Sequence, residues 1–494
     1  MTVNDLISIC EPVETRGERP SAIGSLTQDS RKVSDQSAFI AVRGIRTDGH
    51  LFIKDAVARG AAAVICEDPS ETDNLDVFVI VVEDTQSLLG PLAQAFEGNP
   101  ARELEVIGIT GTNGKTTVAT LAYQVLRKLG ARPSLLGTAG KRILNEIHDS
   151  ILTTADPVEL ASDMHKMVEA GSTHLVMEIS SHALDQQRID GIPFRVAAFT
   201  NLSHDHLDYH ETEEAYASAK KKLFERLTPD AAAIVNGDDA WHTFMTEDCR
   251  AEIIRFGMDE EADVQFKIIS STQQGLELDI GGQRVVSPLV GGFNAYNITC
   301  AYLICKSFGF DSRNISAAFE SSTGAAGRLE RVIGDEEGDQ PLVLVDYAHT
   351  PDALRNVLGS LRDLKQKSQN LHVIFGCGGD RDRSKRPEMA QIAEEYADSI
   401  TVTSDNPRSE DPESIIDEIM EGFSAKEDVF RITDRRKAIH HAIDNAGPRE
   451  IILIAGKGHE TYQEIDGERY DFDDRKVALE ALGSRNGNPK AEVH

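Results

Sequence analysis

The fold is decided by residues 105–128, EVIGITGTNGKTTVATLAYQVLRK. The apolar run at residues 105–110 predicts a buried strand that leads into a glycine-rich turn at residues 111–114, and the segment from Lys115 onward has the pattern of a helix. A strand, a glycine turn and a helix N-terminus direct backbone amides and the positive end of the helix dipole toward a phosphate. The stretch therefore predicts a nucleotide-binding loop within an α/β sheet.

The loop has the compact spacing G-x-x-G-K-T, shorter than the common P-loop. Lys115 can neutralise the β- and γ-phosphates, and Thr116 can ligate Mg²⁺. A GKT that follows a strand and opens a helix favours nucleotide binding over an ordinary tight turn. The predicted nucleotide contacts are Gly111, Thr112, Asn113, Gly114, Lys115, Thr116 and Thr117.

The 494 residues on either side of this loop predict about three α/β domains, bounded at residues 1–98, 99–331 and 332–494. Strand-like runs at 38–42, 62–66 and 77–82 alternate with helical stretches in the first block, which ends in a polar link at 97–103. Further runs at 175–181, 196–202 and 231–239 lack strict alternation, which is typical of strands covered on both faces.

The third block repeats one pattern four times: VLVDYAHTPD, HVIFGCGGDRD, ITVTSDNPR and IILIAGKGHE. Each is an apolar strand followed by a loop that carries charged residues. Ligands of parallel sheets gather at the carboxyl ends of strands, so these loops are expected to hold a substrate. The last residues, 483–494, are expected to be a frayed tail.

Charge and cysteine content exclude several classes of protein. Lys and Arg number 51 against 82 Asp and Glu, a net charge of −31 that disfavours nucleic-acid and membrane binding. No apolar run approaches the ~20 residues of a membrane-spanning helix, which predicts a cytoplasmic protein. Six cysteines without a CxxC pair argue against a zinc site or a disulfide framework and are expected to be reduced and mostly buried: Cys10, Cys66, Cys249, Cys300, Cys305 and Cys377.

Two candidate metal ligands follow predicted strands of the second block. Glu178 lies in MEISSH and His206 in NLSHDHLDYH, where His204 is a rival ligand. Taken alone, a capping carboxylate and an ordinary loop histidine are the simpler interpretations. Each residue could instead be a ligand of Mg²⁺ beside the phosphate loop, and the residues alone leave both interpretations open.

Three consecutive lysines occur in the helical stretch at residues 214–227. Helical spacing places Lys220 on the same apolar stripe as Tyr216 and Leu223, whereas Lys221 and Lys222 point away and are expected to be solvated. A buried lysine has a depressed pKa and a nucleophilic neutral amine.

Together, TGTNGKTT and the segments containing Glu178, His206 and Lys220 resemble the Mur ligase family, the ATP-dependent amide-forming enzymes of peptidoglycan synthesis, with folylpolyglutamate synthetases as relatives. All three blocks contribute motifs in the family's order. The resemblance implies an N-terminal UDP-binding domain, a central P-loop ATPase domain with a mostly parallel sheet and a C-terminal Rossmann-like domain. It also implies a cytoplasmic monomer that acts in cell-wall biogenesis, and hence in cell shape and division.

The resemblance assigns catalytic roles to Lys115, Glu178, His206 and Lys220. Thr116, Glu178 and His206 would ligate Mg²⁺, and Lys220 would be carbamylated by CO₂ to give a further anionic ligand. Adenine and phosphate contacts are implied for Asn294, Asn297, Arg328 and Asp346, although AAGR replaces the usual PGR before the arginine.

Substrate contacts are implied in the first two blocks. In the first block, the segment TQDSRKVSDQSAFIAVRGIRTDGHLFI resembles the UDP-binding signature of the branch that adds the third amino acid. In the second block, TTADP stands where the family usually has TTPxP. The matching positions are Gln28, Ser30, Ile45, Arg46 and Thr47 for the UDP-sugar, and Thr153, Thr154, Ser180, Gln186 and Arg188 for the muramoyl peptide. Arg188 would hold a carboxylate of D-glutamate.

The motif DNPR, made by Asp405, Asn406, Pro407 and Arg408, resembles the pattern of the ligases that add meso-diaminopimelate. A guanidinium grips a carboxylate with two charge-assisted hydrogen bonds. L-Lysine lacks the distal carboxylate and would leave Arg408 unpaired. Arg381, Gly456 and Glu460 match the other contacts of this amino acid, and Glu460 suits its ammonium group.

The implied reaction is phosphorylation by ATP of the D-glutamate γ-carboxylate of UDP-MurNAc-L-Ala-D-Glu, followed by attack of the diaminopimelate amine on the acyl phosphate. His349 and Asp346 are both candidates for the general base. Addition of L-lysine, folate polyglutamylation and a P-loop switch or motor are the alternatives. Arg408 disfavours the first, the UDP-type block the second and the charged strand-end loops the third.

Overall fold

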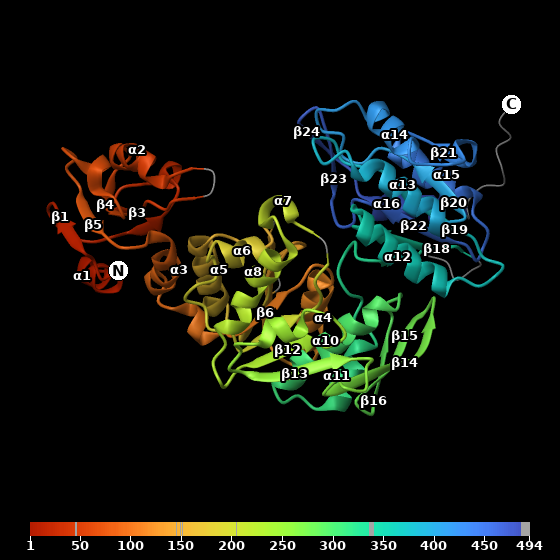
Figure 1. Cartoon of the computed structure of the whole chain (residues 1–494), viewed down its shortest axis with the longest axis horizontal. Coiled ribbons are helices and arrows are strands. Elements are labelled where there is room, and N and C mark those ends of the chain that lie inside the picture. Colours follow the sequence, from red (N-terminus) through yellow and green to blue (C-terminus); the bar gives the residue numbers. More distant parts are fainter. Residues whose placement is uncertain are drawn as a thin grey trace. The chain divides into compact units, whose positions relative to one another are not determined.

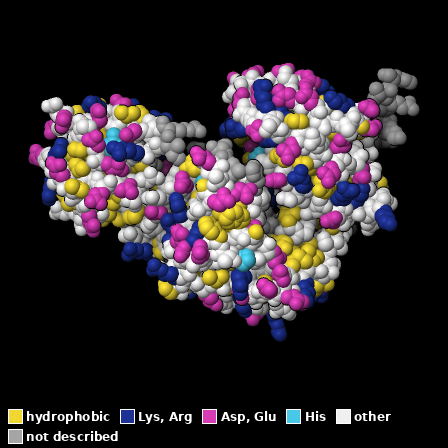
Figure 2. All heavy atoms as spheres, viewed as in Figure 1, with side chains coloured by type: hydrophobic (Ala, Val, Ile, Leu, Met, Phe, Trp, Pro, Cys, Tyr) yellow, Lys and Arg dark blue, Asp and Glu magenta, His cyan; other side chains and the backbone are white. Residues whose placement is uncertain are grey.

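The computed structural model describes residues 1–44, 47–144, 146–148, 150, 152–203, 205–334 and 340–485. The chain divides into two compact units, one made of Met1–Phe256 with Leu303–Gly309 and the other of Gly257–Tyr302 with Phe310–His494. Figure 1 labels their helices and strands. Asp and Glu side chains spread over the visible face rather than gathering in one patch (Figure 2).

The first unit begins with a five-stranded sheet in the order β1-β5-β4-β3-β2. Its strands β2 (Ser25–Thr27), β3 (Ser37–Ile40), β4 (Ala61–Cys66) and β5 (Phe78–Val81) are parallel, and β1 (Glu14–Arg16) is antiparallel. Helices α1 (Val3–Cys10) and α3 (Thr85–Phe96) pack on one face and α2 (Ile53–Ala58) on the other. The predicted strands are confirmed to within one or two residues.

A second sheet of the first unit carries the phosphate loop. Its parallel strands are β13 (Glu252–Gly257), β12 (Ala232–Asn236), β11 (Val196–Phe199), β6 (Glu105–Thr110), β10 (His174–Glu178) and β7 (Pro133–Gly137), followed by the antiparallel β8 (Gly140–Ile143) and β9 (Glu146–His148). Because β6 lies between β10 and β11, the segments that follow these three strands meet at one sheet edge.

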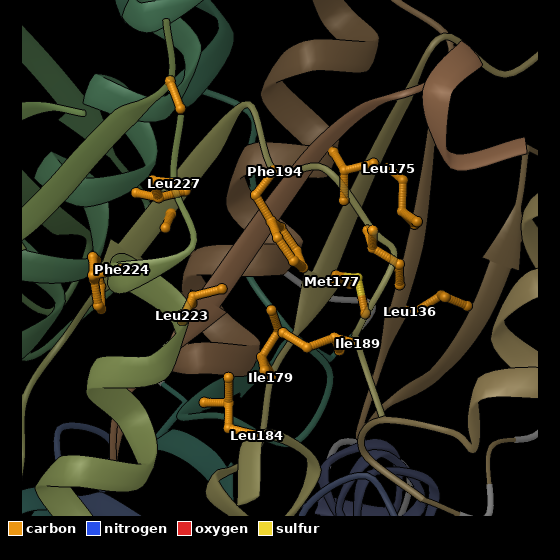
Figure 3. Close-up of a cluster of buried hydrophobic side chains, with 14 of the residues drawn as sticks. Leu136, Leu175, Met177, Ile179, Leu184, Ile189, Phe194, Leu223, Phe224 and Leu227 are labelled. Carbon is orange, nitrogen blue, oxygen red and sulfur yellow. The ribbon is translucent and has the colours of Figure 1, made fainter. Parts of the chain in front are cut away.

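Helices cover both faces of this sheet. They are α4 (Lys115–Lys128), α5 (Pro157–Glu169), α6 (Ser181–Asp185), α7 (Leu207–His210), α8 (Glu213–Glu225) and α9 (His242–Thr246). One face packs into a large apolar core to which α5, α6 and α8 contribute. Figure 3 labels side chains of this core from β7, β10, α6, α8 and adjoining segments: Leu136, Leu175, Met177, Ile179, Leu184, Ile189, Phe194, Leu223, Phe224 and Leu227.

The segment at residues 97–103, expected to be a polar link, is a packed junction. It contains a 3-10 turn at Pro100–Glu103, and both Pro100 and Ala101 are buried. The Ala101 amide donates to Gln94 Oε1 at 3.2 Å. Sequence polarity missed this because the amide side chain that satisfies the backbone belongs to the preceding helix.

The C-terminal sheet of the second unit has the order β17-β18-β22-β19-β20-β21. Strands β18 (Leu342–Asp346), β22 (Ile451–Ala455), β19 (Leu371–Phe375), β20 (Ser399–Val402) and β21 (Val429–Arg431) are parallel, and β17 (Glu330–Val332) is antiparallel. Helices α12 (Pro351–Leu364), α13 (Lys385–Tyr396) and α14 (Pro412–Met420) cover one face, and α15 (Arg435–Asn445) and α16 (Asp474–Arg485) cover the other. The four repeated strand–loop segments are confirmed as neighbours.

Several elements were not predicted. The second unit contains an antiparallel meander of β14 (Val264–Thr272), β15 (Gly275–Ile280) and β16 (Gln283–Ser287), and a hairpin of β23 (Tyr462–Ile465) and β24 (Glu468–Asp471). Helices α10 (Phe293–Ser307) and α11 (Ser312–Phe319) follow the meander. The prediction of a frayed tail from residue 483 was wrong for its first three residues, because α16 (Asp474–Arg485) continues to Arg485. Residues 486–494 lie outside the described part of the chain.

All six cysteines are free thiols, and five of them are buried, as predicted. Among the described residues, no helix combines the length and apolar character needed to cross a membrane.

Candidate active site

The phosphate loop is shaped by two glycines that have positive φ. Gly111 has φ +144°, and a Cβ there would lie 2.0 Å from Thr200 Oγ1, so only glycine fits between β6 and the segment after β11. Gly114, with φ +86°, is the N-cap of α4 and brings no side chain over its first turn. The amides of Thr112 and Asn113 donate to Asn201 O and Oδ1 at 2.8 and 2.9 Å. The loop is therefore rigidly placed at the N-terminus of α4.

Two lysines converge on one carbonyl of this loop. Lys115 Nζ donates to Gly111 O at 2.8 Å and to Thr112 O at 2.7 Å, while Lys220 Nζ donates to the same Gly111 O at 2.9 Å. The Lys220 side chain is buried, as the helical pattern predicts, and lies 4.4 Å above the ring of Tyr216. Burial, and next the charge of Lys115, hold the pKa of Lys220 well below its usual range. This environment favours a neutral amine.

The expectation that Lys221 is solvated was wrong. Its side chain is buried, and Nζ bonds to Asp248 at 2.6 Å and to Glu247 at 3.2 Å, above the ring of Phe244. Helix α9 and the turn after it cover this side of α8, which helical spacing alone cannot show. Lys222 remains partly exposed and pairs with Asp185 at 3.1 Å.

Glu178 lies at the end of β10, beside the start of α4. It is buried, and Thr116 Oγ1 donates to Glu178 Oε2 at 2.8 Å while the Thr138 amide donates to Oε1 at 2.8 Å. A Cβ on Gly137, in the neighbouring strand, would lie 2.2 Å from Oε1, so the absence of a side chain at residue 137 makes room for the Glu178 carboxylate. Thr116 and Glu178 thus present two hard oxygen donors together, as Mg²⁺ prefers.

His206 lies beyond β11 in a left-handed backbone conformation, φ +55°. Its ring centroid is 5.0 Å from that of His182, and Nε2 is 3.6 Å from Asp205. His204 lies outside the described residues. Within the described residues, no group of three or more His, Cys, Asp or Glu side chains is placed to hold a metal ion, so a cation at Thr116 and Glu178 would need phosphate or water oxygens as well.

The residues expected to contact the muramoyl peptide lie beside Glu178. Thr154 Oγ1 donates to Glu178 O at 2.9 Å and accepts from the Ser180 amide at 3.1 Å. Arg188 donates to Thr154 O at 2.9 Å and through Nη2 to Gln186 Oε1 at 2.6 Å. Burial lowers the pKa of Arg188, so this cation is partly desolvated, which suits recognition of a carboxylate.

Three further hydrogen bonds extend this network. Thr153 Oγ1 lies 3.1 Å from Thr138 Oγ1, which joins it to the Glu178 pocket. Gln186 Nε2 donates to Tyr209 Oη at 3.2 Å, and Tyr209 Oη donates to Asp185 at 3.0 Å. Tyr209 was not singled out from the sequence, because nothing in its neighbourhood along the chain indicates that it supports Gln186.

The residues expected to hold the UDP-sugar are only partly described. Gln28 lines a cavity of about 560 Å³ together with Lys141 and Asp163, and Ser30 begins a 3-10 turn after β2. Thr47 is exposed, and its carbonyl accepts from the Gly44 amide at 3.0 Å. Ile45 and Arg46 lie outside the described residues.

In the second unit, the loops after β20 and β22 interlock. Asn406 Nδ2 donates to Glu460 Oε2 at 2.8 Å, and Lys457 Nζ donates to Asn406 Oδ1 at 2.9 Å and to Glu460 Oε2 at 3.1 Å. A Cβ on Gly456 would lie 2.4 Å from Asp405 Oδ2, so the glycine permits this close approach. The fully buried Lys457 was missed in the sequence, although it stands inside the GKGHE motif.

Arg408 and Arg381 occupy neighbouring loops of the same unit. Arg408 has φ +53° and donates through Nη1 to Gly379 O at 2.7 Å, and its side chain is 22% exposed, so it can reach a ligand. Pro407 is buried within this loop. Arg381 is exposed, with Nη1 3.3 Å from Asp380 O.

The predicted adenine and phosphate contacts also lie in the second unit. Asn297 Nδ2 donates to Asn294 Oδ1 at 2.8 Å, and Arg328 lies 4.7 Å from the centre of the Tyr347 ring. Asp346 is buried and accepts from the amides of Leu329 and Ala348 at 2.6 and 2.8 Å. Burial raises the pKa of Asp346, against the opposing charge of Arg328. Asp346 therefore anchors the Arg328 loop.

A strand, a glycine turn and a helix N-terminus beside a partly buried and a fully buried lysine, in a protein of mostly parallel sheets, are typical of the P-loop class of α/β proteins. Comparison with known families makes this more specific. Residues 22–97, 109–305 and 327–458 match the Mur ligase catalytic, middle and glutamate ligase domains, respectively. The chain belongs to the Mur ligase family.

Relatives match over nearly the full length. The chain is 42% identical over 485 residues to UDP-N-acetylmuramoyl-L-alanyl-D-glutamate--2,6-diaminopimelate ligase of Cytophaga hutchinsonii, covering 98% of this chain and 99% of that protein. The ligase of the same name from Geobacillus kaustophilus is 42% identical over 480 residues, with 95% and 96% covered.

Solved structures give the same result for the fold. A structure of a ligase with this name is 34% identical, with a TM-score of 0.71 and 98% and 99% of the two chains covered. MurF from Acinetobacter baumannii, 20% identical with a TM-score of 0.62 and 98% of each chain covered, shares the fold.

Proposed function

We propose that this protein is the ATP-dependent ligase that joins meso-diaminopimelate to the D-glutamate γ-carboxylate of UDP-MurNAc-L-Ala-D-Glu, in cytoplasmic synthesis of the peptidoglycan precursor. The observation that carries the choice of amino acid is the placement of the Arg408 cation and the Glu460 anion on interlocked loops of one unit. These charges complement the distal carboxylate and ammonium of diaminopimelate. Relatives of this name at 42% identity support the same assignment.

The first step transfers the γ-phosphoryl group of ATP to the γ-carboxylate oxygen of D-glutamate. The bond between the γ-phosphorus and the β-bridging oxygen breaks, ADP leaves and an acyl phosphate forms. Lys115 and the amides at the start of α4 would stabilise the negative charge on the phosphates. Asn294, Asn297 and Arg328 would contribute the remaining nucleotide contacts.

Thr116 and Glu178 would hold Mg²⁺ with His206, because the first two present adjacent oxygen donors. When bound, the ion neutralises phosphate charge. The buried amine of Lys220 suits carbamylation, in which its nitrogen attacks the carbon of CO₂ and a proton is released, leaving an anionic carbamate as a further ligand.

The second step is attack of the diaminopimelate amine on the acyl carbon, with departure of inorganic phosphate and loss of one proton from the nitrogen. Asp346 is occupied by two backbone amides, which favours His349 as the group that accepts this proton. Thr153, Thr154, Ser180, Gln186 and Arg188 would hold the peptide, and Gln28, Ser30 and residues 45–47 the UDP-sugar. The proposed domains are residues 1–98, 99–331 and 332–494 of a monomer.

A phosphate-release assay tests this assignment. Release is expected only when ATP, UDP-MurNAc-L-Ala-D-Glu and meso-diaminopimelate are all present, and L-lysine should substitute very poorly. Phosphate release from ATP alone would indicate a P-loop switch, and equal use of L-lysine would place the protein in the lysine-adding branch.

A further inference from the structure

Two loops of the second unit, residues 376–384 after β19 and residues 403–411 after β20, are packed backbone to backbone. The Gly379 amide donates to Asn406 O at 2.9 Å, and Arg408 Nη1 donates to Gly379 O at 2.7 Å. A Cβ on Gly379 would lie 1.9 Å from Pro407 O. The loop that carries Arg381 and the loop that carries Arg408 therefore cannot move independently.

Each loop contains a residue with a strained backbone, at or next to the arginine that it carries. Asp380, which precedes Arg381, has φ +53°, and so does Arg408. This is a left-handed backbone conformation that residues other than glycine rarely adopt. Such conformations persist only where the surrounding structure holds them. Part of that support comes from β23, because the Arg408 amide donates to Glu464 O at 3.0 Å.

Ser409 of the second loop also donates to the Asp380 carboxylate, and further support comes from an ion pair whose arginine is buried. Arg386, at the start of α13, has a fully buried side chain, and its Nη2 and Nη1 donate to the two carboxylate oxygens of Glu410 at 2.9 and 3.1 Å. The same guanidinium donates to Gly378 O at 3.3 Å and to Glu418 at 2.8 Å.

Glu410 extends the pairing into both loops. Its Oε1 accepts the Asp380 amide at 2.6 Å, and its own amide donates to Pro407 O at 3.0 Å. Hydrogen bonds from Arg386, and next from the Asp380 amide, lower the pKa of Glu410 to about 2. Through its carboxylate Glu410 thus joins α13 to the strained residue of the first loop, and through its amide it bonds to the backbone of the second.

We propose that Arg386 and Glu410 are positioning residues that set the spacing of Arg381 and Arg408 for recognition of the distal carboxylate of the amino-acid substrate. This inference rests on the proposed function. Arg386 cannot touch a ligand, because none of its side chain is exposed, so it acts through the two loops. A buried ion pair contributes little net stability against an apolar replacement, whereas its bidentate geometry restricts the position of both partners.

Arg383 provides a matched control on the same two carboxylates. Its Nη2 donates to Glu410 at 2.9 Å and its Nη1 to Glu418 at 3.3 Å, but its side chain is 63% exposed. Exposed ion pairs of this kind contribute little. Arg383→Met removes the same charge from the same cluster without opening the buried pair.

The experiment measures phosphate release by Arg386→Met and Arg383→Met while each substrate is varied in turn. In Arg386→Met, KM for meso-diaminopimelate should rise about tenfold or more, because small displacements of binding groups are costly. The ratio of kcat/KM for meso-diaminopimelate to kcat/KM for L-lysine should fall. KM for ATP and for the UDP-substrate should change less than about twofold, as should all three values in Arg383→Met. Arg386→Lys, which keeps the charge without the planar fork, should recover only part of the loss.

Glu410→Gln covers the case in which Arg386→Met fails to fold, since it keeps the size of the side chain and an acceptor for the Asp380 amide. It should show the same selective rise in KM. An unchanged KM for diaminopimelate in these variants, or a parallel rise for all three substrates, would overturn the proposal.

Amide hydrogen exchange separates this proposal from the assignment of function. Residues 376–384 and 403–411 should both exchange faster in Arg386→Met than in Arg383→Met. If the unmodified enzyme releases no phosphate with diaminopimelate, the proposed function fails and so does the substrate role of the pair. If the unmodified enzyme uses diaminopimelate but amide exchange in Arg386→Met equals that in Arg383→Met, the positioning role of Arg386 and Glu410 is rejected and the proposed function stands.

Discussion

The phosphate loop of the first unit and the arginine loops of the second unit hold charge in opposite ways. Around Gly111 O, Lys115 and Lys220 approach one backbone carbonyl, and burial lowers the pKa of Lys220. Around Glu410, in contrast, Arg386 holds a carboxylate firmly ionised. The first arrangement favours a reactive neutral amine, whereas the second favours fixed charges that recognise a ligand.

The two regions also differ in how they are assembled. The phosphate loop is a continuous strand, turn and helix whose shape depends on glycine and on backbone hydrogen bonds. The arginine loops come from separate strand ends and depend on side-chain pairing between them. Substitutions in the first region should therefore affect chemistry, and substitutions in the second should affect choice of substrate.

Lys115→Ala should have the largest effect. Loss of the cation nearest the phosphates is expected to lower kcat/KM by about 10³-fold or more. Affinity for the UDP-substrate, measured by titration calorimetry, should be nearly unchanged, because its proposed contacts lie elsewhere. A parallel loss of UDP-substrate affinity would show that the phosphate loop does not serve ATP alone.

Lys220→Ala should lower activity by about 10²-fold or more, because the variant lacks the buried amine on which the anionic carbamate is proposed to form. Added short-chain carboxylates should restore part of the activity by occupying the vacated position. Phosphate release measured with and without added formate or acetate tests this. Near-normal activity without any addition would remove the carbamate from the mechanism.

Arg408→Ala should lower kcat/KM for meso-diaminopimelate by about 10²-fold and affect the slow use of L-lysine far less. The reason is that L-lysine lacks the distal carboxylate that the guanidinium is proposed to bind. The ratio of the two kcat/KM values is the measurement. If both fall in step, Arg408 supports the loop without selecting the substrate.

Lys221→Met should have the smallest effect, with kcat/KM within about twofold of the unmodified enzyme. Its ammonium contacts Asp248 and Glu247, in the turn after α9, whereas the Lys220 ammonium contacts the phosphate loop. Paired with Lys220→Ala, it compares two adjacent lysines that helical spacing directs to different surroundings. A loss comparable to that of Lys220→Ala would mean that burial of Lys220 is not what distinguishes it.

Local patterns predicted much of both regions. The buried strand at Glu105–Thr110, the glycine turn after it and the inward position of Lys220 all follow from short-range periodicity and residue type. The four strand-end loops of the second unit were recognisable for the same reason, because parallel strands and their terminal loops are each read within about a dozen residues.

Only the tertiary structure decided which side chains meet. By itself the sequence determined that Arg381 and Arg408 lie in loops that each follow an apolar strand. It did not show that Glu410 binds both Arg386 and the Asp380 amide. It did not show that α9 buries Lys221 or that Lys457 joins Asn406 to Glu460. Secondary structure depends on neighbours along the chain, whereas the partner of a buried charge depends on which distant loop reaches it when the sheets form.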